Sequence, residues 1–416
     1  MIDFDPYSHR FQDDPYPVYR RLRDEAPVHW CARARVFSVT RHEDLRQVFK
    51  DPERFSSETR RLNRFGRSQT TAAQRVRILW RVLTQMRQNP LKMRDSRMLI
   101  MEDPPVHGQM RSLVNRGFTR RRIAQWEGRI RELVDECMER IRQQESFDLV
   151  TELAIPLPVT VISELLGVSA EDRHLFKRWS DNLIEGATGS AIENPIESGI
   201  LDTLAELTRY MKPVIRARRE KPREDLISVL VDETADDAGL DEFEIVMFIL
   251  LLLVAGNETT TNLLGNCVDA LLDHPAELEK VVADPSLVPA LVEETLRFDA
   301  PVQQLRRVVR GDTELAGVKL PAGSELLLFI GSANRDERIF EDPDRFDVGR
   351  DTRGHLGFGL GNHFCLGSNL ARLEAKAALE ALVPELPKLA RLRSERDFID
   401  SFTIRGRARL ELRRAA

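Results

Sequence analysis

The sequence lacks the features of a secreted or membrane-anchored protein. Its first ten residues include Asp3 and Asp5 and contain no basic start followed by an apolar run, which argues against a signal peptide or an N-terminal anchor. The longest uncharged apolar run, 245–256, has 12 residues, well short of the ~20 that a membrane-spanning helix needs. We therefore predict a cytoplasmic protein with no membrane span, in which this run is a buried helix.

Cysteines are few and far apart. Cys31, Cys137, Cys267 and Cys365 show no CxxC or CxxH pairing, which argues against a zinc site and against a disulfide framework. Any cysteine chemistry in this protein is therefore expected to come from a single thiol.

The chain has the composition of a folded globular protein. Of its 416 residues, 42% are hydrophobic and 31% are charged, and neither an internal repeat nor a low-complexity linker interrupts it. A chain of this length and balance can bury a large core.

Apolar residues recur three and four positions apart over most of the chain, which predicts helices. The segments with this spacing are 127–144, 201–219, 241–272, 289–298 and 366–382. Shorter stretches rich in β-formers lie at 28–40, at 313–329 with a turn at 321–323, and at 398–412. The sequence thus predicts a mainly α protein with small β-sheets beside a helical body.

Positive charge gathers in one segment. Residues 60–97 hold eleven Lys or Arg against the single acid Asp95, a local charge of +10, which leaves −15 for the rest of a chain whose net charge is −5. Apolar and basic residues there fall on separate helical faces, which predicts an amphipathic helix. The residues are Val76, Leu79, Trp80 and Leu83 on one face and Arg77 and Arg81 on another.

Two interpretations of this basic segment stay open. Charge runs usually face solvent, which favours a solvated lid. The alternative is a wall of the substrate pocket that receives an anionic substrate or an acidic partner. Nucleic acid is not an expected partner, because the net charge is negative and no basic motif interleaved with aromatic residues is present.

A glycine-rich loop around Cys365 is the most specific feature of the sequence. Residues 355–372 read HLGFGLGNHFCLGSNLAR, and the cysteine stands directly before a predicted helix, whose N-terminal amides and dipole favour a thiolate. Gly359, Gly361 and Gly367 allow the backbone to turn tightly and to approach a flat ligand closely. The alternative is a structural cysteine buried after a glycine-rich turn.

A second candidate site lies in the apolar central helix. Glu258 is costly to bury there unless it has a partner or a task, and Thr259 beside it offers a hydroxyl donor. Gly256 and the β-branched residues that follow it are expected to weaken the regularity of the helix, which could admit oxygen or water. The alternative is a kinked core helix with Glu258 facing solvent.

These two runs resemble motifs of the cytochrome P450 family. The loop matches the spacing FGxGxHxCxG through Phe358, Gly359, Gly361, His363, Cys365 and Gly367. The helix matches the family's AGxET pattern from Ala255 onward. The resemblance implies heme b with Cys365 as the axial iron ligand. Thiolate ligation of heme iron favours cleavage of the oxygen–oxygen bond.

The same resemblance implies roles for the neighbouring residues. Phe358 would shield the sulfur from water, His363 would point to a heme propionate, and Ala255 would lie close to the heme. Glu258 and Thr259 would relay protons to dioxygen.

Further motifs agree with the resemblance. Glu294 and Arg297 match the family's ExxR, whose helical spacing puts both ends on one face and ties them to the segment before the cysteine loop. Arg307, with Arg306 as its rival, resembles the strand arginine that binds a heme propionate.

The segment 103–111 matches the family's DPPxHxxxR. It places His107 and Arg111 on one face of a helix that begins after the prolines. Both side chains would face the propionates, where charge-assisted hydrogen bonds are strong.

The resemblance implies the cytochrome P450 fold, with the heme buried between the long central helix and the helix of the cysteine loop. Because residues from 107 to 365 would touch one cofactor, we expect one domain over residues 1–416, although single cores usually stop growing near ~250–300 residues. The implied activity is O2-dependent monooxygenation of a small lipophilic substrate. No flavin or nicotinamide fingerprint is present, so electrons would come from an external ferredoxin or flavodoxin and its reductase.

Other functions stay open at this stage. They are a peroxide-driven oxygenase, a heme-thiolate isomerase and a non-catalytic heme sensor, which would not need Glu258 and Thr259. An acidic redox partner could dock on a basic patch near the thiolate side, formed by Arg120–Arg122, Arg372 and Lys376. By analogy, the substrate-facing residues are Val254, Ala255, Val302 to Leu305 including Gln303, Phe402 and Thr403.

Overall fold

The computed structural model describes residues 2–59, 80, 83–84, 96–187, 199–232, 239–393 and 395–415. Contacts between residues group the chain into two compact units. Unit 1 contains residues 1–56, 120–158 and 259–416, and unit 2 contains residues 57–119 and 159–258. The boundary passes through the central helix between Glu258 and Thr259. One cooperative domain over residues 1–416 stays a prediction.

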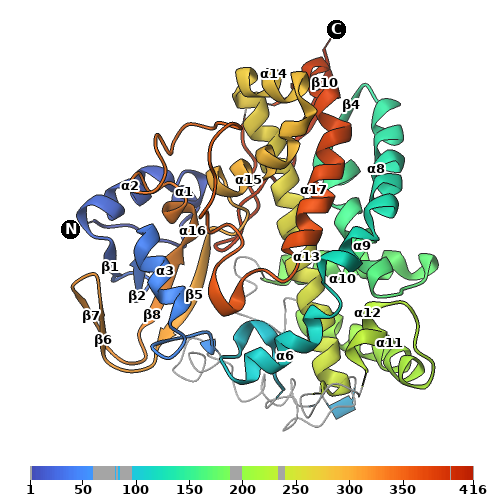
Figure 1. Cartoon of the computed structure of the whole chain (residues 1–416), viewed down its shortest axis with the longest axis horizontal. Coiled ribbons are helices and arrows are strands. Elements are labelled where there is room, and N and C mark those ends of the chain that lie inside the picture. Colours follow the sequence, from blue (N-terminus) through green and yellow to red (C-terminus); the bar gives the residue numbers. More distant parts are fainter. Residues whose placement is uncertain are drawn as a thin grey trace. The chain divides into compact units, whose positions relative to one another are not determined.

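Unit 1 contains a five-stranded sheet that joins the start of the chain to residues near position 300, as the blue and orange arrows of Figure 1 show. Its strand order is β1 (Val28–Cys31), β2 (Val36–Val39), β8 (Glu325–Phe329), β5 (Gln304–Val309) and β3 (Phe55–Ser56). The pair β2 and β8 is parallel and the other pairs are antiparallel.

Both faces of this sheet are covered. On the central strand β8, Leu326 to Phe329 are all fully buried, which explains why this strand is a continuous apolar run and does not alternate. One apolar cluster contains Leu326 and Leu328 together with Leu45 and Phe49 of α3 (His42–Lys50). The other contains Leu327 and Phe329 with aromatic residues of α1 (His9–Asp13) and α2 (Tyr16–Glu25).

In its described residues, unit 1 also contains six whole α-helices besides those that cover the sheet. They are α7 (Arg120–Ala124), α8 (Glu127–Arg142), α14 (Pro275–Ala283), α15 (Val288–Phe298), α16 (Ile330–Ala333) and α17 (Ser368–Leu382). Helix α17 packs against α8, α15 and α7. Two smaller sheets complete the unit, one of β4 (Ser146–Asp148), β10 (Glu411–Arg414) and β9 (Leu389–Arg391) and one of β6 (Thr313–Leu315) and β7 (Val318–Leu320).

Unit 2 is helical in its described residues. Its helices are α6 (Val106–Asn115), most of α9 (Pro156–Leu165), α10 (Arg173–Ala187), α11 (Ile200–Glu220) and α12 (Leu226–Leu230). Arg218 of α11 and Asp225, the N-cap of α12, form a buried ion pair at 2.5 Å. The pair fixes the turn between these two helices.

Helix α13 (Glu242–Asp273) is the central helix of the sequence prediction. Among the described residues it is the one helix long and apolar enough to cross a membrane, but 61% of its most apolar stretch is buried inside the protein. This burial agrees with the expected core helix. The helix continues through Gly256 without interruption, so the predicted loss of regularity is not observed.

The glycine instead allows two helices to pack closely. A Cβ atom at position 256 would lie 3.2 Å from Cδ1 of Ile162 on α9, which is tighter than an ordinary van der Waals contact. Gly256 therefore serves the packing of α13 against α9 within unit 2.

The structure confirms a mainly α protein with small β-sheets. Each of the five predicted helices is present with its ends within two residues of the prediction. The β-rich stretch predicted at 398–412 is mostly wrong. Only isolated bridges join Phe398 to Arg407 and Val302 to Ile404, and strand β10 begins at Glu411.

The predicted amphipathic helix of the basic segment lies almost entirely outside the described residues. The structure describes three residues there, Trp80, Leu83 and Thr84, and all three are helical. The side chains of Trp80 and Leu83 are exposed. At the far end of the segment, Arg97 donates two hydrogen bonds to Glu244 in the first turn of α13, at 2.6 and 2.8 Å. The segment is thus fastened within unit 2 where it ends.

Candidate functional site

The cysteine loop is held by backbone hydrogen bonds across its own width. The N–H of Cys365 donates to the carbonyl of Phe358 at 2.9 Å, and the N–H of Gly359 donates to Leu356 at 2.8 Å. A short 3-10 turn at Gly361–His363 follows, and α17 begins at Ser368 with Gly367 as its N-cap. Cys365 therefore stands just before the N-terminus of a 15-residue helix, which favours negative charge on its sulfur.

Cys365 differs from the other three cysteines. It is partly exposed, whereas Cys31, Cys137 and Cys267 are buried, and none of the four forms a disulfide. Burial raises the pKa of Cys31 and Cys137, and it raises the pKa of Cys267 to about 12. These three thiols stay protonated at neutral pH, which leaves Cys365 as the candidate thiolate.

Two glycines of the loop are required by its geometry, because Gly359 and Gly361 have φ angles of 69° and 72°, where L side chains are strained. A Cβ at Gly361 would also lie 2.5 Å from the carbonyl oxygen of Phe49. At Gly367, by contrast, no heavy atom of the described residues other than its chain neighbours lies within 4 Å of a Cβ. The loop thus combines a soft sulfur ligand with a backbone that only glycine can follow, which fits a heme.

Arg307 and Arg306 on β5 have different environments. Arg307 is 7% exposed, its Nη1 donates to the backbone carbonyl of Arg306 at 2.7 Å, and it lies over the ring of Phe49. The side chain of Arg306 is 42% exposed and pairs with Glu325 at 3.1 Å. Arg307 is therefore the more buried of the two, and its role toward a heme propionate stays a prediction.

The pair predicted from ExxR is fully buried. Glu294 and Arg297 on α15 form two hydrogen bonds of 2.7 and 2.8 Å. Further donors of Arg297 reach the carbonyls of Asn334, Pro343 and Arg345, and Glu294 accepts the N–H of Asp347. The pair ties α15 to the segment that precedes the cysteine loop.

A neighbouring cluster was missed by the sequence reasoning. Glu293 lies next to Glu294 and is hydrogen-bonded to Arg372 on α17 and to His355 at the start of the loop. No motif marked it, because the three residues are 62 and 79 positions apart along the chain. An acid directly before the ExxR pair was the only available signal.

On α13, Glu258 is buried and Ala255 is exposed, while Val254 and Thr259 are half-buried. Burial raises the pKa of Glu258 to about 7, and its Oε1 has no hydrogen-bond partner among the described residues. The alternative of a solvent-facing Glu258 is therefore wrong. A carboxyl with this pKa can both accept and release a proton at neutral pH.

His107 and Arg111 lie on α6, which starts after Pro105 as predicted, and His107 is buried. They belong to unit 2, whereas Arg307, His363 and Cys365 belong to unit 1. The roles of His107, Arg111 and His363 toward heme propionates stay predictions.

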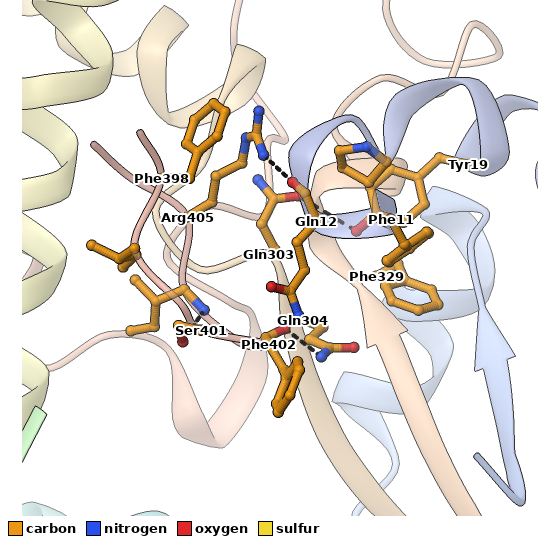
Figure 2. Close-up of a pocket in the computed structure, with 13 residues that line it drawn as sticks. Phe11, Gln12, Tyr19, Gln303, Gln304, Phe329, Phe398, Ser401, Phe402 and Arg405 are labelled. Atoms are coloured by element: carbon orange, nitrogen blue, oxygen red, sulfur yellow. Dashed lines mark hydrogen bonds between the residues drawn. The ribbon is translucent and has the colours of Figure 1, made fainter. Parts of the chain in front are cut away.

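Gln303 and Phe402, two of the predicted substrate contacts, line a small pocket of unit 1 beside α1 and α2, shown in Figure 2. The cavity volume of about 30 Å³ suits water and not a lipophilic substrate. Gln303 uses its side chain to accept from Tyr19 and to donate to Ala300. Val302 is half-buried and bridges to Ile404, and the substrate contacts of all these residues stay predictions.

The basic patch proposed for a redox partner is partly neutralised within unit 1. Arg372 pairs with Glu293 at 2.5 Å and Lys376 with Glu380 at 3.7 Å. Arg120, Arg121 and Arg122 are exposed at the start of α7. The exposed part of the predicted docking face is therefore the α7 end.

Comparison with known proteins agrees with these features. The family profile described as Cytochrome P450 matches residues 81–386 of the chain. Cytochrome P450 107B1 of Saccharopolyspora erythraea is 36% identical, with 99% of this chain and 97% of that protein aligned. Vitamin D(3) 25-hydroxylase of Pseudonocardia autotrophica is 38% identical over 93% of this chain and 90% of that protein.

A solved structure extends the likeness to three dimensions. The crystal structure of CYP109E1 from Bacillus megaterium in complex with testosterone superposes with a TM-score of 0.82 at 34% identity, and the match covers 97% of this chain and 100% of that one. The predicted fold is thereby confirmed.

Proposed function

The chain belongs to the cytochrome P450 family, whose members are monooxygenases that bind heme b, and on that premise we propose that Cys365 would hold the heme iron through its thiolate. When bound, the heme would supply oxygen activation, which thiolate ligation favours. The observation that carries this proposal is the position of Cys365. It is the one partly exposed cysteine of the chain, and it stands before the N-terminus of α17.

The protein residues contribute binding and proton transfer in this proposal. Arg307, His363, His107 and Arg111 would bind the carboxylates of the cofactor by charge-assisted hydrogen bonds. Phe358, whose carbonyl accepts the N–H of Cys365 at 2.9 Å, would exclude water from the sulfur with its ring. Glu258, with a pKa of about 7, and the neighbouring hydroxyl of Thr259 would carry protons into the site.

The proposed substrate is a small lipophilic molecule that receives one oxygen atom of O2. Relatives of the chain include a vitamin D(3) 25-hydroxylase and a protein crystallised with testosterone, and the exposed Ala255 and half-buried Val254 of α13 are apolar. Electrons would come from a separate ferredoxin or flavodoxin and its reductase. We infer a cytoplasmic location for this reaction, since that is where such soluble carriers and their nicotinamide supply are found.

The proposed ligand is tested by spectroscopy of the purified holoprotein. The reduced carbon-monoxide complex should show the thiolate-shifted Soret absorption, and Cys365→Ser should abolish it. Cys31→Ser is the matched control, because a serine hydroxyl can still donate to the Phe4 carbonyl as the thiol does at 3.2 Å. A thiolate-shifted spectrum that survives in Cys365→Ser would sink the proposal.

The source of oxygen separates monooxygenation from its closest alternative. With a ferredoxin system, the enzyme should consume O2 and NADPH in step with product, whereas a peroxide-driven oxygenase needs peroxide alone. The buried acid Glu258 supports the first case, because peroxide already carries the protons and the second oxygen atom. Product formed only with added peroxide would favour the alternative.

A further inference from the structure

Three segments that are far apart in the sequence meet at one carboxylate beside the cysteine loop. Glu293 of α15 accepts from Nε and Nη2 of Arg372 on α17, at 2.5 and 2.9 Å. The same carboxylate is 2.9 Å from Nε2 of His355, ten residues before Cys365. Glu293 therefore joins α15, the start of the loop and α17, the helix that follows the loop.

The arginine of this cluster touches the aromatic residue of the loop. The guanidinium carbon of Arg372 lies 4.4 Å from the ring centroid of Phe358, within the range of a cation–π contact. The carbonyl of Phe358 in turn accepts the N–H of Cys365 at 2.9 Å. A short chain of contacts thus runs from Glu293 through Arg372 and Phe358 to the sulfur-bearing residue.

At the start of the loop, two hydrogen bonds define the tautomer of the His355 ring. Its Nδ1 accepts the N–H of Gly357 at 3.1 Å, so the proton of the neutral ring lies on Nε2 and is donated to Glu293. The position of Gly357 leaves no freedom here, since a Cβ would lie 2.7 Å from the carbonyl oxygen of Leu296 on α15. The residue before Phe358 is therefore fixed against the same helix that carries Glu293.

The charges of the cluster are balanced where they are partly shielded from water. The side chains of Glu293, Arg372 and His355 are 25%, 36% and 8% exposed. Burial by itself raises the pKa of Glu293. The hydrogen bonds from Arg372 and His355 outweigh this effect and lower the pKa to about 2. Glu293 is therefore ionised at neutral pH and offsets the positive charge of Arg372.

We propose that Glu293 is a positioning residue for the thiolate, which holds Arg372 against Phe358 and cancels the charge of that guanidinium beside Cys365. The inference rests on the proposed function, because the charge matters through the heme that Cys365 would bind. Charges in a partly buried site act on each other with little screening by salt. The reduced heme carries one negative charge more than the oxidised heme, so an uncompensated cation nearby stabilises it.

The test is the midpoint reduction potential of the substrate-free holoprotein, measured in the wild type and in three variants. Glu293→Gln keeps a hydrogen-bond acceptor for Arg372 but removes the negative charge, so the potential should shift in the positive direction. Arg372→Gln leaves Glu293 uncompensated and should shift the potential in the negative direction. Combining both changes should return the potential close to that of the wild type, since the two charges are removed together.

Two further variants separate charge from position. Arg372→Lys keeps the charge but loses the planar two-point contact with Glu293 and the stacking on Phe358. Its potential should stay near the wild-type value, while its carbon-monoxide complex should lose the thiolate-shifted absorption faster on mild heating. Glu380→Gln is the matched control, because Glu380 lies on the same helix α17 and pairs with Lys376 at 3.7 Å and with Arg131 of α8 at 2.9 Å, both outside the loop. It should change neither measurement.

The outcomes distinguish the two proposals. If the wild type lacks the thiolate-shifted absorption, the proposed function fails and this inference falls with it. If the wild type shows it but Glu293→Gln and Arg372→Gln shift the potential in the same direction, or no more than Glu380→Gln, the inference alone is overturned. A merely structural role would lower stability in both variants without giving shifts of opposite sign.

Discussion

Arg297 and Glu294 form a two-point ion pair in which neither side chain is exposed, with 2.7 Å from Nε to Oε2 and 2.8 Å from Nη2 to Oε1. The guanidinium also donates to the carbonyls of Asn334, Pro343 and Arg345. The Nε, Nη1 and Nη2 atoms of Arg297 thus all donate to acceptors. Such a buried pair is costly to break, because removal of one partner leaves the other charge without compensation.

Arg297→Ala should lower the free energy of unfolding by about 3–5 kcal/mol and should reduce heme retention. The control is Arg129→Ala on α8, which breaks an ion pair of the same spacing with the exposed Glu132 and should cost less than about 1 kcal/mol. Urea unfolding of both variants, with the heme-to-protein absorbance ratio, measures the difference. Equal losses in the two variants would mean that burial of the Glu294 pair adds nothing.

Thr259→Ala should uncouple electron use from product formation. The variant should still consume NADPH and O2 but should release more peroxide and less product, because the hydroxyl beside Glu258 is lost from the proton path. Thr259→Ser keeps the hydroxyl and serves as the control. The ratio of product to NADPH consumed is the measurement, and an unchanged ratio in Thr259→Ala would point to a heme sensor or to another proton route.

Arg307→Leu should weaken heme binding, whereas Arg306→Leu should leave it close to normal. The physical difference is exposure, since Arg307 is 7% exposed and Arg306 lies on the surface with Glu325 as its partner. Transfer of heme to an excess of apomyoglobin reports the loss rate of each variant. Faster loss from Arg306→Leu than from Arg307→Leu would exchange the roles of these two neighbours.

The sequence predicted the elements whose own residues specify them. Helix α13 was readable because its apolar run is bounded by acids, and α17 because its apolar residues repeat at helical spacing after the cysteine. The loop motif was readable in part because two of its glycines have a geometric reason, as the φ angles of Gly359 and Gly361 show. These are local properties, and local properties are visible in sequence.

What the sequence could not show depends on contacts between distant residues. In residues 398–412 part of the pairing is with Val302 and Gln303, about a hundred positions earlier, which the local pattern of residues cannot show. The arginine at position 372 was expected to serve a redox partner, and only the fold reveals that Glu293 already binds it. Whether a charged side chain is paired is a property of the folded chain.

Glu374 on α17 gives a prediction about stability and pH. The side chain is 1% exposed, and its Oε1 has no hydrogen-bond partner among the described residues. Burial raises the pKa of Glu374 from 4.5 to about 8, although a hydrogen bond from Thr260 acts in the opposite direction. Between these two values the folded protein holds a proton that the unfolded chain has released, so stability falls as pH rises through this interval.

Glu374→Gln removes this dependence, because an amide is neutral at every pH. The stability of the variant relative to wild type should therefore rise from about pH 5.5 to about pH 8.5, by an amount on the order of a few kcal/mol. Urea unfolding of both proteins at the two pH values measures it, with Glu380→Gln on the same helix, partly exposed and paired with Lys376, as the control. Other titrating groups contribute equally to wild type and variant and cancel in the comparison. The contrary result is a difference in unfolding free energy between Glu374→Gln and wild type that stays constant or narrows as pH rises. It would show that the carboxyl of Glu374 is already ionised in the folded protein at neutral pH, with a compensating partner.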